Sequence, residues 1–209
     1  MLKLGSQFYA VADPAGGHDP VELAETLLAA GARILQLRLK HACGRDFLAA
    51  ALAIAPRCRA SAALFIVNDR VDVAILSGAD GVHLGQDDLP IAPARKLIGP
   101  DKIIGISTRD VATALAAQEA GADYIGFGPM YAGGLKNTQR GQGLDNLRAV
   151  RAAVKIPIVA IGGITEATMS EVLAAGADAA AIISDVVKSP DIPAKVRALL
   201  AIKPSRASQ

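Results

Sequence analysis

Short apolar runs alternate with amphipathic segments along the whole chain of 209 residues. An apolar run of about four to eight residues bounded by polar or glycine residues is typical of a buried strand, and apolar residues spaced three and four apart are typical of a helix that buries one face. Strand-like runs lie at residues 8–13, 34–40, 64–69, 81–86, 103–107, 124–129, 158–163 and 180–184. Helical periodicity lies at residues 20–30, 45–60, 71–76, 91–98, 111–120, 144–154, 166–175 and 192–202. The chain therefore repeats a strand–helix unit eight times.

This order predicts an α/β fold, a single-domain (β/α)₈ TIM barrel over residues 1–202, with residues 203–209 as a disordered tail. A recurring turn supports the repeat: AGAR (30–33), SGAD (77–80), AGAD (120–123) and AGAD (175–178) each end a helix just before a strand. Glycine there supplies the left-handed residue that ends a helix. An open doubly wound sheet is the alternative, but it usually carries GxGxxG after its first strand, where this chain reads ADPAGG.

Polar residues alternate with leucines in the second strand-like run, ILQLRLK. Because strand side chains point to alternate faces, Gln36, Arg38 and Lys40 share one face, which we expect to line the lumen of the barrel and its mouth. Two cations two residues apart in a cleft favour binding of a multiply charged anion. An edge strand with ordinary surface charges is the alternative, and it fits poorly because parallel strands are normally covered on both faces.

Carboxylates follow the third and fourth strand-like runs. Asp69 ends the sequence FIVND, and Asp88 lies just beyond GVHLGQD. The carboxyl ends of barrel strands meet at one mouth, so we expect these two side chains to lie close together. Mg²⁺ takes a few oxygen ligands from the protein and shares the rest with substrate phosphates, so the pair predicts a Mg²⁺ site. N-capping of the following helix is the alternative for either aspartate taken alone.

Hydroxyl and glycine residues end other strands at the same mouth. Ser107 ends the fifth run, Gly162 and Gly163 end the seventh, and Ser184 ends the eighth. Loops after strands seven and eight recurrently bind phosphate in such barrels, and tight turns without a ligand are the alternative. His83, alone within a strand, is expected to be a hydrogen-bonded structural residue. Separate sites for a diphosphate and a monophosphate predict displacement of diphosphate by a second, phosphorylated substrate.

Composition and charge narrow the range of partners. No apolar run approaches the ~18 residues of a membrane span, and a net charge of +2 gives no global field for nucleic acid or anionic membrane. Cys43 and Cys58 lack metal-site spacing and indicate a reducing compartment, and the first residues lack the pattern of a signal peptide. We therefore expect a cytoplasmic protein with small-molecule substrates and no nucleic-acid or membrane partner. The sequence leaves a homo-oligomer open.

Several motifs, taken in order, resemble those of the thiamine-phosphate synthase family and its relative, the thiazole tautomerase. They are QLRLK, FIVNDRVDVA, GADGVHLGQDDL, GADYIGFGPMY and IPIVAIGGIT, and they extend over nearly the whole chain. The resemblance implies a Mg²⁺-dependent transferase that moves an aminopyrimidine-methyl group from its diphosphate to a thiazole phosphate. Diphosphate leaves, thiamine phosphate forms, and no side-chain nucleophile is required.

The resemblance also implies roles for individual residues. The aminopyrimidine diphosphate would be bound by Gln36, Arg38, Lys40, Asn68, Ser107 and Lys136, among which Arg38, Lys40, Lys136 and Ser107 would serve catalysis. Asp69 and Asp88 would hold Mg²⁺. The thiazole phosphate would be bound by Gly163, Ile183 and Ser184.

The loop GPMYAGGLK departs from the family pattern G-P-x-[FY]-x-T-x-T-K, whose two threonines contact the thiazole substrate. Gly133 and Leu135 stand at those positions, and each lost hydrogen bond to a charged group would remove ~1.5–3 kcal/mol of binding. Three functions remain open: a synthase with an altered thiazole pocket, a tautomerase-like isomerase, and a non-catalytic barrel that retains the diphosphate. The intact diphosphate and Mg²⁺ residues favour the synthase. An isomerase would need a general base, and GISTRD has no histidine after Ser107.

Overall fold

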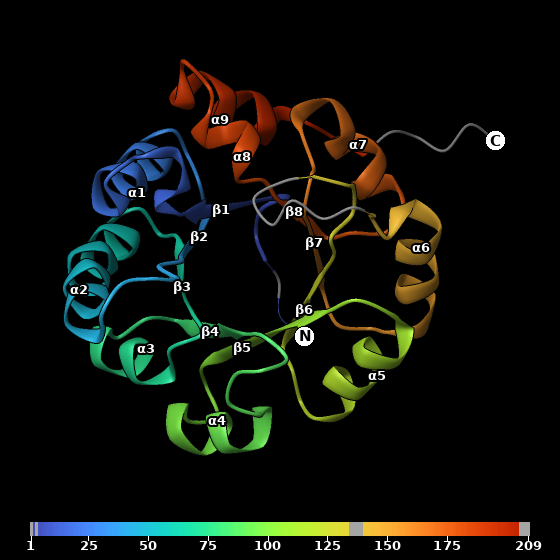
Figure 1. The fold of residues 1–209 in the computed structure, drawn as a ribbon, viewed down its shortest axis with the longest axis horizontal. Coiled ribbons are helices and arrows are strands. Elements are labelled where there is room, and N and C mark those ends of the chain that lie inside the picture. The colour runs from blue at the N-terminus through green and yellow to red at the C-terminus, as the bar shows by residue number, and fades with distance from the viewer. Residues whose placement is uncertain (1, 3, 134–139, 205–209) are drawn as a thin grey trace.

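The eight predicted strands form one closed parallel barrel (Figure 1). The structure is a computed structural model that describes residues 2, 4–133 and 140–204. The strands are β1 (Phe8–Ala12), β2 (Ile34–Leu37), β3 (Leu64–Asn68), β4 (Gly81–Leu84), β5 (Ile103–Thr108), β6 (Tyr124–Phe127), β7 (Ile158–Ile161) and β8 (Ala179–Ala181). They pair in chain order, and β8 closes the ring by pairing with β1, Phe8 opposite Ala180 and Tyr9 opposite Ala181. The predicted (β/α)₈ barrel is confirmed, and the open doubly wound sheet is excluded.

Helices surround the barrel as a ring (Figure 1). The expected ones are α1 (Pro20–Ala29), α2 (Gly44–Ala60), α3 (Val71–Ser77), α4 (Ile91–Ile98), α5 (Val111–Glu119), α6 (Gly143–Ala153), α7 (Glu166–Ala174) and α9 (Ile192–Ala201). Two short helices were not expected, η1 (Pro14–Gly16) after β1 and α8 (Ser184–Val187) after β8. None of the described helices is both long and apolar enough to cross a membrane.

Several strands end earlier than the apolar runs predict. β2 stops at Leu37, before Arg38, and β8 is Ala179–Ala181 in place of the predicted 180–184. Ile182 continues the apolar pattern and is buried, yet it lies beyond the strand, and Ser184 already begins α8. Apolar patterning reports burial and not strand pairing, so it could not locate these ends.

Apolar side chains form two layers, one on each face of the sheet. Leu35 and Leu37 belong to the layer between the barrel and its helices. Tyr9 and Tyr124 belong to the layer inside the barrel, together with Leu4 from the segment before β1. The alternation in β2 therefore has the predicted direction, since its leucines face the helices while Gln36 faces the interior.

The recurring turn joins neighbouring strands as well as ending helices. Its glycines are left-handed as expected, with φ of 108° at Gly31, 69° at Gly78, 90° at Gly121 and 110° at Gly176. In the three copies that end in aspartate, that residue binds a single residue of the neighbouring strand through both its carboxylate and its backbone N–H. The pairs are Asp80 with Phe65, Asp123 with Ile104 and Asp178 with Ile158, and each carboxylate accepts at 2.8 Å. The aspartate therefore sets where β4, β6 and β8 begin relative to their neighbours.

The two free cysteines offer a test of the packing, because Cys43 is exposed and Cys58 is buried. Burial, followed by the charge of Asp80, raises the pKa of the Cys58 thiol from 9.0 to about 12. We expect a thiol reagent to label only Cys43 in the folded protein and both residues in denaturant. Equal labelling of both in the folded protein would contradict this packing.

The same pKa shift predicts how stability changes in alkali. Between pH 9.0 and about 12 the unfolded chain loses the Cys58 proton while the folded chain keeps it, so the free energy of unfolding falls as the pH rises through this window. Urea unfolding across the window measures the fall. Cys58→Ala should make the fall smaller, whereas Cys43→Ala, the matched control, should leave it unchanged.

Candidate active site

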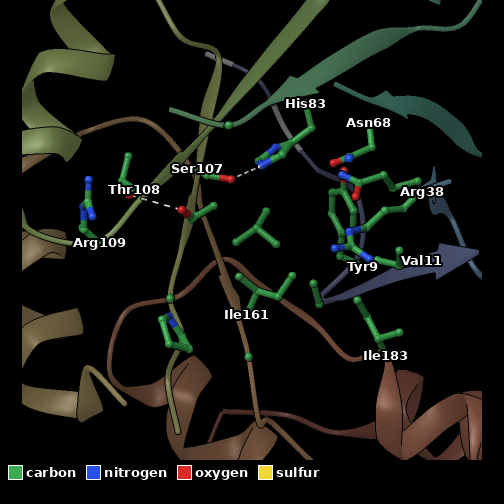
Figure 2. A pocket seen from close by; sticks show the side chains of 18 of the residues that line it. Tyr9, Val11, Arg38, Asn68, His83, Ser107, Thr108, Arg109, Ile161 and Ile183 are labelled. Atoms are coloured by element: carbon green, nitrogen blue, oxygen red, sulfur yellow. Dashed lines mark hydrogen bonds between the residues drawn. The ribbon is translucent and has the colours of Figure 1, made fainter. Parts of the chain in front are cut away.

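A cavity of about 470 Å³ opens at the carboxyl ends of the strands, and all eight strands contribute to its wall. Figure 2 shows polar side chains of Arg38, Asn68, His83 and Ser107 around it. Every predicted site residue that the structure describes lines this cavity: Gln36, Arg38, Lys40, Asn68, Asp69, Asp88, Ser107, Gly133, Gly163, Ile183 and Ser184. Leu135 and Lys136 lie outside the described residues.

The two predicted cations are each held by an aspartate. Arg38 Nη1 donates to the carboxylate of Asp13, a buried residue just past β1. The other oxygen of Asp13 accepts from Ala15 N at 2.8 Å and so caps η1. Lys40 Nζ lies 2.5 Å from Asp69 Oδ2 and is more exposed, with 40% of its side chain accessible. Arg38 is therefore fixed against the wall, while Lys40 keeps freedom to move.

The predicted carboxylate pair is formed, and neither member caps a helix. The N-caps of α3 and α4 are Arg70 and Pro90, which excludes capping as the reason for Asp69 and Asp88. Asp88 Oδ2 accepts from Gly85 N at 2.6 Å. Burial raises the pKa of the Asp88 carboxyl, and the neighbouring Asp69 raises it further. Two carboxylates brought this close favour a cation between or beside them.

Asp69 reaches this position through an unusual backbone. Its φ is +64°, in the left-handed region that residues other than glycine seldom adopt, although aspartate tolerates it better than most. Its N–H donates to the His83 carbonyl at 2.8 Å, which continues the strand pairing by one residue. Such conformations persist where the surrounding structure enforces them and are concentrated at functional sites.

The carboxylate pair fits a hard divalent ion better than a closed structural metal site. Among residues 2, 4–133 and 140–204, no group of three or more His, Cys, Asp or Glu side chains could hold a metal ion. A structural zinc site would need such a group, whereas Mg²⁺ is commonly held by one or two carboxylates plus substrate phosphates. Lys40 Nζ at 2.5 Å from Asp69 shows that a positive charge is accommodated at the pair.

A continuous chain of hydrogen bonds crosses the floor of the cavity. Gln36 Nε2 donates to the Tyr9 hydroxyl at 3.1 Å, and the hydroxyls of Tyr9 and Tyr124 lie 2.9 Å apart. Tyr124 contacts His83 Nδ1 at 2.9 Å, and His83 Nε2 contacts Ser107 Oγ at 2.9 Å, the bond drawn in Figure 2. Burial raises the pKa of both tyrosines, so both phenols keep their protons. We call these five residues the polar chain.

Gly162 and Gly163 line the cavity and also have a packing reason to be glycine. Their φ values are +98° and +69°. A Cβ on Gly162 would lie 2.7 Å from Pro129 Cα, and one on Gly163 would lie 2.9 Å from Tyr131 Cβ. The β6–α6 loop rests on this turn, with Met130 N donating to the Ile161 carbonyl at 2.9 Å. The turn is thus required by the fold. The short helix α8 follows β8 and contacts the start of α7, where Asp185 accepts from Glu166 N at 2.9 Å.

Gly133, one of the two departures from the family pattern, has φ of +88°. No atom lies within 4 Å of the position that a Cβ would take there, so a larger side chain would meet no obstacle. The backbone, however, adopts a conformation that a β-branched residue strongly disfavours. A threonine here would therefore require a different local backbone. Glycine at this position permits the loop conformation that the structure shows.

Sequence reasoning missed several residues of the cavity. No pattern in the sequence indicates Arg109, which lines the cavity just past β5, or Asp13, which lies just past β1 and holds the cavity residue Arg38. Tyr9 and Tyr124 occupy inward positions of their strands, so period-two alternation could have placed their hydroxyls in the lumen. His83 is hydrogen-bonded as expected, but it lines the cavity and is only partly buried.

Comparison with known proteins agrees with this geometry. The family profile described as thiamine monophosphate synthase matches residues 8–186. A thiamine-phosphate synthase of Methanoculleus marisnigri is 48% identical over 199 residues, covering 94% of each chain. One of Methanocella arvoryzae is 50% identical over 184 residues, covering 87% of this chain and 86% of its own. The solved thiamine phosphate pyrophosphorylase from Pyrococcus furiosus superimposes with a TM-score of 0.88 at 38% identity, covering 95% of this chain and 96% of its own. The chain belongs to the thiamine monophosphate synthase family.

Proposed function

We propose that this cavity binds an aminopyrimidine-methyl diphosphate together with a thiazole phosphate and joins them to form thiamine phosphate. Membership of the family makes the chain a transferase of thiamine-phosphate synthesis. One observation supports the placement of the reaction most strongly. Paired cations, a carboxylate pair and a glycine turn beside a short helix all face the same cavity, although they come from different strands.

The diphosphate is proposed to lie between Arg38 and Lys40, with Lys136 as a third cation from outside the described residues. Arg38 is already oriented by Asp13, so less freedom is lost when it binds an anion. Lys40 is half-exposed and can turn from Asp69 toward a phosphate oxygen. Both cations stabilise negative charge that grows on the diphosphate as its bond to the pyrimidine methylene breaks.

Mg²⁺ is proposed as the ion held by Asp69 and Asp88, where it would neutralise charge on the departing diphosphate. Burial, followed by the neighbouring Asp69, raises the pKa of the Asp88 carboxyl, so a bound cation would stabilise its ionised form and relieve the repulsion between the two carboxylates.

The aminopyrimidine ring is proposed to lie against Gln36, Asn68 and Ser107. Asn68 is 6% exposed, and its carboxamide has no hydrogen-bond partner among the described residues, which leaves it available to a ligand. Gln36 and Ser107 are the two ends of the polar chain and both line the cavity.

The thiazole phosphate is proposed to lie against Gly163, Ile183 and Ser184, with Gly133 and Leu135 replacing the two threonines of the family pattern. In the reaction the methylene–oxygen bond to diphosphate breaks and a bond from the thiazole nitrogen to the methylene carbon forms. Electrons from the aminopyrimidine ring stabilise the methylene cation between these events. The chain's own residues therefore bind, orient and exclude water, and none needs to form a covalent bond.

The structure adds a histidine that bears on the isomerase alternative. His83 lines the cavity, but its two ring nitrogens already contact Tyr124 and Ser107, each at 2.9 Å. A general base needs a nitrogen that can reach the substrate proton, directly or through water. The isomerase also gives no reason for the carboxylate pair, and the comparisons favour the synthase.

The proposed metal site is tested by turnover. With both substrates and Mg²⁺, the protein should form one thiamine phosphate for each diphosphate released, and EDTA should abolish the reaction. Asp69→Asn and Asp88→Asn should each lower kcat/KM by about 100-fold, because charge on the leaving group is then poorly neutralised. Asp110→Asn is the matched control, since Asp110 caps α5 outside the cavity and asparagine also caps helices. Full activity in EDTA would contradict the proposal.

Asp13 provides a second test as a positioning residue for Arg38. Asp13→Asn removes a charged hydrogen bond worth ~1.5–3 kcal/mol, so kcat/KM for the pyrimidine diphosphate should fall by about 10- to 100-fold. If Asp13 acts through Arg38, the same change should have little further effect in an Arg38→Ala background. Equal losses in both backgrounds would show that Asp13 acts independently of Arg38.

A further inference from the structure

The polar chain joins five strands across the barrel interior, and the mechanism above uses only its two ends. Its middle members, Tyr9 and Tyr124, are almost completely buried. Burial of two phenols and a carboxamide in an otherwise apolar lumen is costly unless each hydrogen bond is made. The described residues contain no buried side-chain nitrogen or oxygen atom without a partner, so every buried polar atom of the polar chain is hydrogen-bonded.

The hydrogen bonds of the polar chain run in one direction. The Gln36 nitrogen can only donate, so the Tyr9 oxygen accepts from it. Each phenol carries one hydrogen, and Tyr9 must give its hydrogen to Tyr124, because otherwise a buried hydroxyl would have no acceptor. By the same reasoning Tyr124 donates to His83 Nδ1.

His83 is then a neutral imidazole with its hydrogen on Nε2. Because Nδ1 accepts from Tyr124, the ring hydrogen must lie on the opposite nitrogen, which donates to Ser107 Oγ at 2.9 Å. Ser107 accepts this bond and keeps its own hydroxyl hydrogen for the cavity, which it lines. One end of the chain therefore presents a donor to a ligand.

The other end presents an acceptor. The carboxamide oxygen of Gln36 has no partner among the described residues, and no side-chain oxygen there is both buried and unpartnered, so this oxygen faces the cavity. The polar chain enforces the orientation of the Gln36 amide. A rotated amide would direct its oxygen at the Tyr9 hydroxyl, whose hydrogen is already donated to Tyr124. The cavity thus offers an acceptor from β2 and a donor from β5.

We infer that the polar chain makes Tyr9, Tyr124 and His83 specificity-determining residues that select an aminopyrimidine over the corresponding hydroxypyrimidine. This inference rests on the proposed function, in which the pyrimidine ring lies between Gln36 and Ser107. An aminopyrimidine has amino hydrogens to donate and a ring nitrogen to accept. The hydroxy compound in its keto form has a carbonyl and a ring N–H, which reverses both. A site with fixed hydrogen-bonding polarity rejects such an analogue strongly, since its own groups are left unpaired.

The direction of the polar chain is tested first, without substrate. Nitrogen-15 NMR of labelled histidine distinguishes the two neutral tautomers, and His83→Gln identifies the His83 signals. We expect the hydrogen on Nε2 near neutral pH. A hydrogen on Nδ1 would overturn the inference, whatever the protein catalyses.

Substrate discrimination is tested second, as the ratio of kcat/KM for the aminopyrimidine diphosphate to that for its hydroxy analogue. Tyr124→Phe and His83→Phe interrupt the chain, and each should lower this ratio by at least about tenfold. His83→Gln should restore most of it, because a carboxamide has one acceptor and one donor as the neutral imidazole does. Ser77→Ala is the matched control, since it removes a buried hydroxyl bonded to the Val73 carbonyl in α3.

If the polar chain only stabilises the fold, the experiment gives a different result. In that case Tyr124→Phe would lower the unfolding temperature while leaving the ratio unchanged, and this outcome would overturn the inference. Failure of the proposed function is recognised separately, by absence of turnover in the unmodified protein. Calorimetry would then give the dissociation constants of the two diphosphates, and their ratio replaces the ratio of kcat/KM values. The expectation for each variant is unchanged.

Discussion

Hydrogen bonds between β1 and β8 close the sheet into a ring, and the rest of the structure depends on that closure. A closed parallel sheet has no free edge, and its strands all end at one mouth. Side chains far apart in the sequence, such as Tyr9 and Ser184, therefore line one cavity. The aspartates of the repeated turn support the closure by tying the starts of β4, β6 and β8 to their neighbours.

Closure also creates an interior that must be filled. Along most of the lumen aliphatic side chains fill it, but toward the mouth two tyrosines, a glutamine and a histidine take their place. These polar groups are tolerated because they satisfy one another, and that mutual satisfaction leaves each with a defined orientation. The same interactions that make the interior stable thereby determine which hydrogen-bonding groups face a ligand.

At the mouth of the barrel, two features of the charged residues favour ligand binding and lower the stability of the ligand-free protein. Asp88 is held beside Asp69 although its carboxyl pKa is raised, and Asp69 adopts a left-handed backbone. Each feature disfavours the ligand-free fold, and each would be relieved or used when a cation and an anionic substrate bind. Arg38 shows the opposite arrangement, because Asp13 already compensates its charge and fixes its direction.

The spacing of apolar residues and the composition by themselves determined the fold class, the order of the elements and the strand ends from which site residues project. Gln36, Arg38, Asp69 and Asp88 could be predicted because each follows from local alternation or from its place after a strand. Only the tertiary structure decided that Asp13 partners Arg38, that Tyr9 meets Tyr124, and that His83 lines the cavity. These contacts join residues of different strands, and their distances depend on barrel closure and strand stagger, which no local pattern in the sequence encodes.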